Sequence, residues 1–232
     1  MNKKRESLAL MGYSLEDYIK MFSLHEDELT MNILDCYAGV NSFAAEMAIK
    51  QGKVIAWDPL YELPVTDIER LSKTAQLAVM KDMQAHPERY RTPDLNHFQI
   101  QHEKNRQQLL QDLPLGLQQR RYHVAAFPHL SFADESFDLA LINHFLFRQN
   151  HSPALDFHKL VIKELIRIAN EIRIFPLVTT QSTLSPLIGE VIEYCQQENL
   201  GVELRHVDYE LQKQGNALLR IWKPSCTVAA HH

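Results

Sequence analysis

Two short apolar runs, separated by one loop and one helical segment, constrain the fold of this chain more than any other feature. Asn32–Cys36 reads as a buried strand and is followed by a loop with a single glycine, Gly39. The next segment is predicted to be a helix that Asn41-Ser42 caps and Gly52 ends, and Lys53–Asp58 reads as a second strand. A β-loop-α-β unit of about thirty residues predicts a parallel α/β sheet.

Helical segments flank this unit on both sides. Ser14 is followed by an acid three residues later, a capping-box pattern that predicts a helix over residues 14–24. Residues 65–121 are polar and predict a helical insertion or lid. Its two helices are expected around 67–83 and 96–112, and the proline residues that separate helical segments are Pro87, Pro93 and Pro114.

After the insertion, alternating strands and helices return. The predicted strands are Arg121–Ala125, Phe137–Asn143, Glu171–Val178, Val202–Tyr209 and Asn216–Trp222. The predicted helices between them are Ala154–Ala169 and Leu184–Asn199. The last two strands are joined through Gln214-Gly215, which predicts an antiparallel closing hairpin.

Composition narrows the class of protein. A chain of 232 residues that is 45% hydrophobic suits a single domain, residues 1–232. Its net charge of −5 makes a nucleic-acid partner unlikely, because phosphate contacts need a basic face. Three cysteines without a CxxC pair, and twelve histidines without a ligand spacing, predict neither disulfides nor a metal site. With no apolar run of membrane-spanning length, we expect a cytoplasmic protein without a membrane partner. The oligomeric state stays open.

Five segments in this order resemble the class I S-adenosylmethionine-dependent methyltransferases. They are ILDCYAGVNSF, VIAWDPLY, LSFADESFDLALINHF, EIRIFPLV and the final hairpin. The resemblance points to an uncharacterised bacterial subgroup of this family. It implies a Rossmann-like α/β fold: a mostly parallel seven-stranded sheet with an antiparallel C-terminal hairpin and a helical insertion after the second strand. It also implies S-adenosyl-L-methionine as the cofactor.

The resemblance assigns roles to the first loop. Asp35 is expected to orient the loop or the ligand, and Gly39 to let the backbone approach the methionine moiety. The family usually carries DxGxGxG, and here the first and third glycines are replaced by Tyr37 and Asn41. Asn41 is a mild departure, because asparagine tolerates a left-handed backbone. Tyr37 is a larger departure that could narrow the pocket or cover the cofactor. The alternative for the whole segment is a plain strand-to-helix turn.

The resemblance also assigns residues that follow the next strands. Asp58, before Pro59, is expected to accept hydrogen bonds from both ribose hydroxyls, or else only to end its strand. A polar side chain that reads out adenine is missing at Ala125, which leaves the backbone amides of Ala126 and Phe127.

Asn143 and His144 follow the central strand and are expected to face the methyl donor. His144 is the candidate general base, and a structural histidine is the alternative. Arg173 lies on a predicted strand. We expect it to pair with an acid, to hold an anionic substrate or, slightly favoured, to lie on an exposed edge.

Together these features predict a methyltransferase acting on a small-molecule acceptor. A degenerate homologue that holds the cofactor weakly or not at all is the first alternative, motivated by Tyr37, Asn41 and Ala125. A nucleic-acid or protein methyltransferase also stays open. A nicotinamide-dependent oxidoreductase would need GxGxxG at the first turn, which Gly39 alone does not supply.

Overall fold

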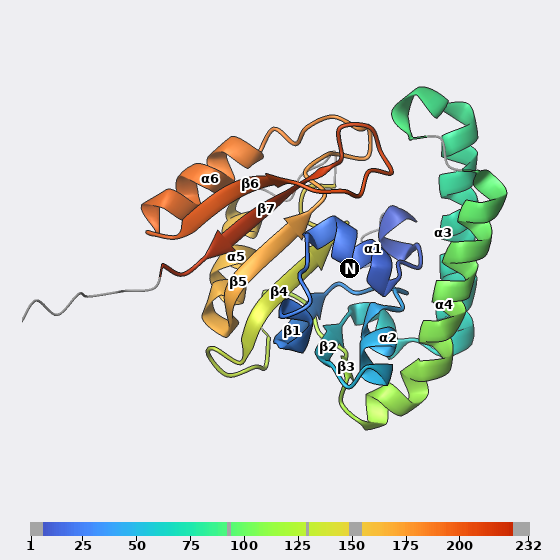
Figure 1. Cartoon of the computed structure of the whole chain (residues 1–232), viewed down its shortest axis with the longest axis horizontal. Helices are drawn as coiled ribbons and strands as arrows, with labels where there is room; N and C mark the ends of the chain where they lie inside the picture. The colour runs from blue at the N-terminus through green and yellow to red at the C-terminus, as the bar shows by residue number, and fades with distance from the viewer. Residues whose placement is uncertain (1–6, 92–93, 129, 149–154, 225–232) are drawn as a thin grey trace, which may run out of the picture.

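A computed structural model describes residues 7–91, 94–128, 130–148 and 155–224, and its elements alternate between helices and strands (Figure 1). The strands are β1 (Asn32–Cys36), β2 (Lys53–Trp57), β3 (Tyr122–His123), β4 (Phe137–Asn143), β5 (Ala169–Phe175), β6 (Gly201–His206) and β7 (Ala217–Trp222). The α-helices are α1 (Leu15–Phe22), α2 (Phe43–Ile49), α3 (Val65–Ala85), α4 (Leu95–Gln118), α5 (Leu155–Ile168) and α6 (Ile188–Gln197). Short 3-10 helices are η1 (Ser7–Leu10), η2 (Glu28–Thr30), η3 (Pro59–Glu62) and η4 (Pro87–Arg89).

The strands form one seven-stranded sheet in the order β3-β2-β1-β4-β5-β7-β6. All neighbouring pairs are parallel except those of β7, which runs antiparallel to both β5 and β6. The strand order reverses between β1 and β4, and in open α/β sheets ligands bind at the carboxyl ends of the strands beside such a point. This is the Rossmann-like fold with a closing hairpin that the sequence predicts.

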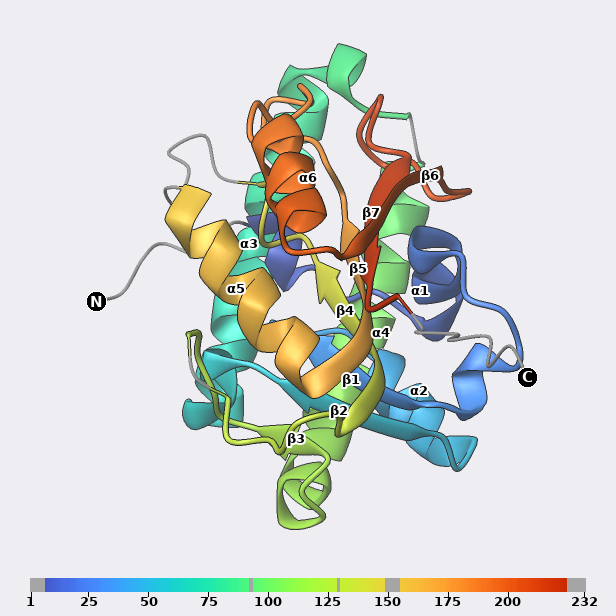
Figure 2. The ribbon, with the colours of Figure 1, turned by 90° about the vertical axis from the view of Figure 1, so that its left-hand side faces the viewer.

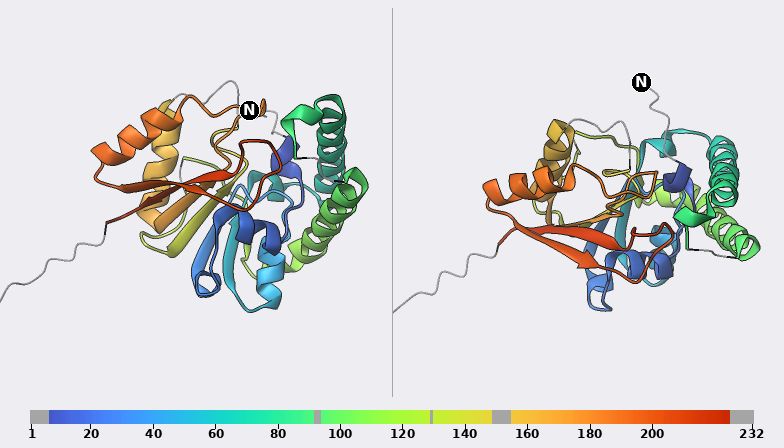
Figure 3. Two further views of the ribbon diagram at one scale, coloured as in Figure 1. Left: turned by 45° about the horizontal axis from the view of Figure 1, so that its top comes forward. Right: turned by 90° about the horizontal axis from the view of Figure 1, so that it is seen from above.

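Helices cover both faces of the sheet (Figure 2). One hydrophobic cluster joins α1, α2 and the insertion helices to one face, and a second joins α5 and α6 to the other. The predicted insertion is present as α3 and α4, which lie side by side at the β3 end of the sheet (Figures 1 and 3). None of the helices in the described part of the chain combines the length and the apolarity needed to cross a membrane.

The predicted capping box is confirmed at the start of α1. Ser14 Oγ accepts a hydrogen bond from the Asp17 backbone at 3.2 Å, and Asp17 Oδ2 accepts one from the Ser14 backbone at 2.8 Å. The helix therefore begins where the sequence predicts. The predicted start of α2 at Asn41-Ser42 is confirmed in position, since Ser42 is the N-cap residue, but its side chain makes no cap bond.

The predicted end of α2 at Gly52 needs correction. The helix ends at Ile49, and Gln51, with φ 62°, takes the left-handed conformation expected of glycine. Gly52 still closes the turn, since its N–H donates to the Met47 carbonyl at 2.8 Å. A Cβ there would lie 2.4 Å from the Met47 methyl group, so that flexible side chain would have to move to admit one.

Pro114 does not separate helices as predicted, because it lies inside α4. Proline removes one helical hydrogen bond, but packing holds the last turn in place. Leu113 is buried, and Gly116 lets the Tyr122 ring lie directly against the helix. Pro93 and the predicted helix start at Ala154 lie outside the described residues.

Several elements are shorter than predicted. The strand predicted to run to Tyr209 ends at His206. β3 keeps only two residues at the sheet edge. β5 ends at Phe175, because Pro176 has no N–H for the ladder. The helix predicted from Leu184 begins at Ile188, because Leu184 forms a β-bridge with Val178.

Candidate functional site

The loop after β1 and the acid after β2 meet at the carboxyl edge of the sheet. The Gly39 N–H donates to Asp58 Oδ2 at 2.7 Å, and the Leu60 N–H donates to Asp58 Oδ1 at the same distance. Asp58 is fully buried and caps η3, whose first residue is Pro59. Gly39, Asp58 and Pro59 therefore lie together at this edge, and their role in binding a cofactor stays a prediction.

The left-handed residues of this loop are not those that the sequence suggested. Gly39 has φ 60°, as a glycine in a tight loop should. Tyr37 also has a positive φ, 54°, whereas Asn41, chosen for its tolerance of that conformation, does not. His144, after β4, is left-handed too, with φ 48°. Bulky residues in this region each store about 1–3 kcal/mol of strain, and such strain gathers at functional sites.

Asp35 lies beneath α1 in a polar cluster that we call the Asp35 cluster: Tyr18, Asp35, Asn41 and Asn143, all buried. The Tyr18 hydroxyl lies 3.0 Å and 3.1 Å from the two Asp35 oxygens and donates to that carboxylate. It accepts a hydrogen bond from Asn41 Nδ2 at 2.7 Å. Burial raises the pKa of the Asp35 carboxyl well above its usual range, although the Tyr18 bond opposes that shift. Tyr18 thus holds the group that the resemblance assigned to the ligand.

Asn143 adds an unsatisfied donor to this cluster. Its Nδ2 is near the Tyr18 hydroxyl but outside hydrogen-bonding geometry, and no other described atom accepts from it. Its Oδ1 lies 2.5 Å from the Nδ1 of His144. A buried amide donor without an acceptor is costly, so a ligand acceptor at this position would stabilise it.

His144 is buried and packed against the segment that precedes α1. Its ring stacks on Tyr13 with centroids 4.9 Å apart, and its backbone N–H donates to the Phe175 carbonyl at 2.8 Å. Burial lowers the pKa of His144 well below its usual range, with Arg148 and His102 adding to the effect. The imidazole is therefore neutral, and a protonated form at this position is costly.

Helix α4 of the insertion binds the backbone of Gly12, the residue before Tyr13. The Gly12 carbonyl lies 2.6 Å from His102 Nδ1 and accepts from Asn105 Nδ2 at 3.0 Å, both on α4. Gly12 itself touches the α4 backbone, where any Cβ would lie 2.6 Å from the His102 carbonyl oxygen. The insertion and the N-terminal segment thus close over the carboxyl edge together, a contact that the sequence did not signal.

A second group of side chains at this edge is aromatic, and we call it the aromatic cluster: Tyr37, Trp57, Phe127, Phe145 and Phe157. The Tyr37 ring stacks on Phe145 with centroids 3.7 Å apart and lies edge-on to Trp57 at 4.7 Å. All its members except Trp57 are half-buried. Phe127 belongs to this cluster, and the neighbouring Ala126 is exposed. Tyr37 therefore packs into this cluster beside the loop.

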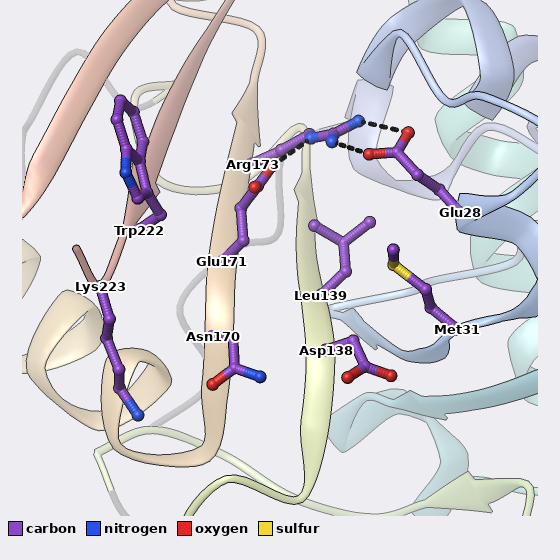
Figure 4. Close-up of a pocket in the computed structure, with 9 residues that line it drawn as sticks. All are labelled: Glu28, Met31, Asp138, Leu139, Asn170, Glu171, Arg173, Trp222 and Lys223. Atoms are coloured by element: carbon purple, nitrogen blue, oxygen red, sulfur yellow. Dashed lines mark hydrogen bonds and ion pairs between the residues drawn. The ribbon is translucent and has the colours of Figure 1, made fainter. Parts of the chain in front are cut away.

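A pocket of about 290 Å³ lies at the opposite, amino edge of the parallel strands (Figure 4). Its lining residues are Glu28, Met31, Asp138, Leu139, Asn170, Glu171, Arg173, Trp222 and Lys223. Within it Arg173 pairs with Glu28 and donates from Nε to Glu171 at 2.7 Å. The expectation of an exposed, edge-strand Arg173 is wrong, because β5 lies between β4 and β7 and the side chain is buried. Pairing with an acid is confirmed.

Comparison with known proteins gives one clear relative. An uncharacterised protein of the archaeon Methanocaldococcus jannaschii is 29% identical over 223 residues, which cover 91% of this chain and 95% of that protein. No family model matches the chain. The bacterial subgroup stays a prediction, because this relative is archaeal.

Solved structures with related architecture include two described as methyltransferases dependent on S-adenosylmethionine. The one from Methanosarcina mazei is 14% identical, with a TM-score of 0.46, and the match covers 86% of this chain and 98% of that one. The one from Aquifex aeolicus is 16% identical, with a TM-score of 0.43, and the match covers 94% of this chain and 92% of that one. At these identities and TM-scores the similarity says nothing of activity, and the strand order of this chain is the firmer evidence for its fold.

Proposed function

We propose that the protein is an S-adenosylmethionine-dependent methyltransferase that acts on a small-molecule acceptor. The observation that carries the proposal is the 2.7 Å bond between Gly39 and Asp58, which joins the loop after β1 to the acid after β2 at the point where strand order reverses. A carboxylate such as that of Asp58 accepts hydrogen bonds only, which suits ribose hydroxyls, and the unsatisfied Asn143 amide suits an anionic or carbonyl group. These residues fit the cofactor.

Roles follow for the residues of this chain. S-adenosylmethionine supplies a methyl group activated by its sulfonium, so the protein mainly has to bind and orient. Asp58 would hold the ribose, Gly39 would let the backbone approach, and Asn143 would donate to the ligand. The Tyr18 hydroxyl, bonded to Asp35 and Asn41, would keep the Asp35 side chain in its orientation beneath α1.

His144 is proposed as a hydrogen-bond acceptor for the methyl acceptor or as its general base. A neutral imidazole can accept a hydrogen bond or a proton, although the burial that lowers the pKa of His144 makes its charged form costly. Methyl transfer by His144→Gln tests the role once an acceptor is known. Unchanged turnover would remove His144 from the mechanism.

The small-molecule acceptor rests on two features. The half-buried aromatic side chains Tyr37, Phe127, Phe145 and Phe157 offer an uncharged surface at the carboxyl edge. The net charge of −5 disfavours a polyanion. Transfer of labelled methyl groups into the low-molecular-weight fraction of a cell extract is expected. Labelling confined to the RNA or protein fraction would contradict this choice.

Calorimetric titration tests the cofactor. We expect heat with S-adenosylmethionine and S-adenosylhomocysteine but not with NAD, and a loss of affinity of at least about tenfold in Asp58→Asn, one ribose hydrogen bond being worth about 1.4 kcal/mol or more. Asp138→Asn, at the amino end of β4, is the matched control and should bind normally. Circular dichroism melts of both variants show whether the fold survives. The proposal fails if neither sulfur compound binds the folded wild-type protein.

A further inference from the structure

The strand β6 ends the sheet and has one bare edge. It pairs with β7 along its whole length, and no other strand of the described residues pairs with it. Figure 3 shows β6 and β7 at the margin of the sheet. A strand edge with unpaired N–H and C=O groups invites pairing with another chain.

The hydrogen-bond ladder fixes which backbone groups point outward. The Val207 N–H donates to the Asn216 carbonyl at 3.0 Å, so residues 207, 205, 203 and 201 form the hydrogen-bonded pairs with β7. The alternate residues Val202, Leu204 and His206 therefore direct their N–H and C=O groups away from the sheet.

The side chains of β6 carry a short self-complementary pattern. Glu203 and Arg205 lie on one face, where Arg205 donates to Glu203 at 3.0 Å. Leu204 points to the other face and is 55% exposed, an unusual position for a leucine on a strand. Leu204 is thus flanked by an acid on one side and a base on the other.

We propose that β6 is the interface between two copies of this chain, paired antiparallel about a two-fold axis at Leu204. In this register the outward N–H and C=O groups of residues 202, 204 and 206 all gain partners in the second copy. Leu204 lies opposite Leu204 of the second copy, and Glu203 lies opposite Arg205 of the second copy, twice by symmetry.

Charge selects this register over its neighbours. Moving the axis to residue 203 places Glu203 against Glu203 of the second copy, and moving it to residue 205 places Arg205 against Arg205. Like charges directly opposite destabilise a strand pair. In the proposed register, Glu203 and Arg205 of the second copy form a non-hydrogen-bonded pair. In such a pair the Cα atoms are about 4.5 Å apart and the side chains are closest.

The same arrangement extends an existing ion-pair chain. Arg220 on β7 already pairs with Glu203 at 3.4 Å and with Glu171 at 2.7 Å. Arg205 of the second copy would approach Glu203, which already pairs with Arg205 and Arg220 of its own chain, so each glutamate would have three arginine neighbours. The dimer is expected to be weak and salt-sensitive, because one strand pair buries little area and its charges are exposed.

Sedimentation equilibrium over a concentration series tests the interface, with Glu203→Arg and Arg205→Glu as variants. The wild-type protein is expected to reach twice the mass of one chain, and each variant alone is expected to stay monomeric, because it opposes like charges. An equimolar mixture of the two variants should regain the dimer, because every opposing pair is then of opposite charge. Recovery on mixing also excludes misfolding as the cause of the monomers.

Leu204→Pro provides a backbone test, since it removes one outward N–H while leaving the bonds to β7 intact. Leu204→Ala keeps that N–H and should dimerise, although more weakly. A wild-type protein that is monomeric at all concentrations overturns the proposal. So do variants that stay dimeric, or a mixture that stays monomeric.

Discussion

Replacing Arg173 with methionine should strongly destabilise the protein. The Arg173 side chain is 2% exposed and its guanidinium serves four partners: Glu28, Glu171 and the carbonyls of Phe22 and Ser23 at 2.8 and 3.2 Å. Arg173→Met keeps the apolar stem but leaves the Glu28 carboxylate, itself only 14% exposed, without its main cation. Glu171 retains Arg220.

The size of the effect follows from these contacts. Removing one partner of a buried ion pair costs about 3–5 kcal/mol, because the remaining charge stays desolvated. Domains unfold at about 5–15 kcal/mol, so this loss is a large part of the total. For a chain of this length it corresponds to a melting point lower by about 6–20 °C.

Urea unfolding followed by circular dichroism measures the loss, with Lys20→Met as control. Lys20 pairs with Glu16 on the surface of α1, where both side chains are largely exposed, so its loss should be within about 0.5 kcal/mol. The double variant Arg173→Met/Glu28→Gln removes both charges and should be more stable than the sum of the single losses predicts, by about 0.5–3 kcal/mol. Additive losses, or a loss below about 1 kcal/mol for Arg173→Met, would refute the reasoning.

Three further changes have expected outcomes. Ser14→Ala should lower the free energy of unfolding by about 1 kcal/mol in urea titrations, and Ser14→Gly by only a few tenths. Both variants remove the hydroxyl that accepts from the Asp17 N–H, but glycine suits the N-cap position better than alanine. Burial raises the pKa of Glu171, but hydrogen bonds from Arg220 and Arg173 outweigh it and the net pKa is lowered from 4.5. The stability that the ionised Glu171 contributes is therefore present above pH 4.5 and is lost as the pH falls below it. In acid, the free energy of unfolding of Glu171→Gln should fall less steeply with pH than that of the wild-type protein. An unchanged slope would contradict the pairing of Glu171 with the two arginines. Burial lowers the pKa of His144 below 6.5, so the unfolded chain takes up a proton before the folded protein does, and the stability falls as the pH drops below 6.5. In thermal melts across this pH range, the melting temperature of His144→Gln should depend less on pH than that of the wild-type protein.

Local patterns made most of the fold predictable. Alternation of apolar runs with helical periods located the strands, and the Ser14–Asp17 spacing placed the start of α1, because both signals act over a few residues. Failures at element ends have a different cause. Pro114 stays helical and Gln51 adopts a left-handed backbone because of packing against residues that the local sequence does not reveal.

The candidate site was predictable only in part. Gly39 and Asp58 could be placed because each follows a strand at a known spacing. The contacts of Tyr18 with Asp35 and of Arg173 with Glu28 could not, since they join residues 17 and 145 positions apart through the tertiary fold. Tyr37 was recognised as a departure, but the structure was needed to show that it carries the left-handed conformation.

The position of the N-terminal segment has a consequence for folding. Its contacts reach far along the chain: Gly12 to His102 over 90 residues, Tyr13 to His144 over 131, and Phe22 to Arg173 over 151. Closing loops of this length is entropically costly until the intervening sheet exists. The contact between Phe22 and Arg173 cannot form before β5 is present, so until then this cover over the carboxyl edge of the sheet is incomplete.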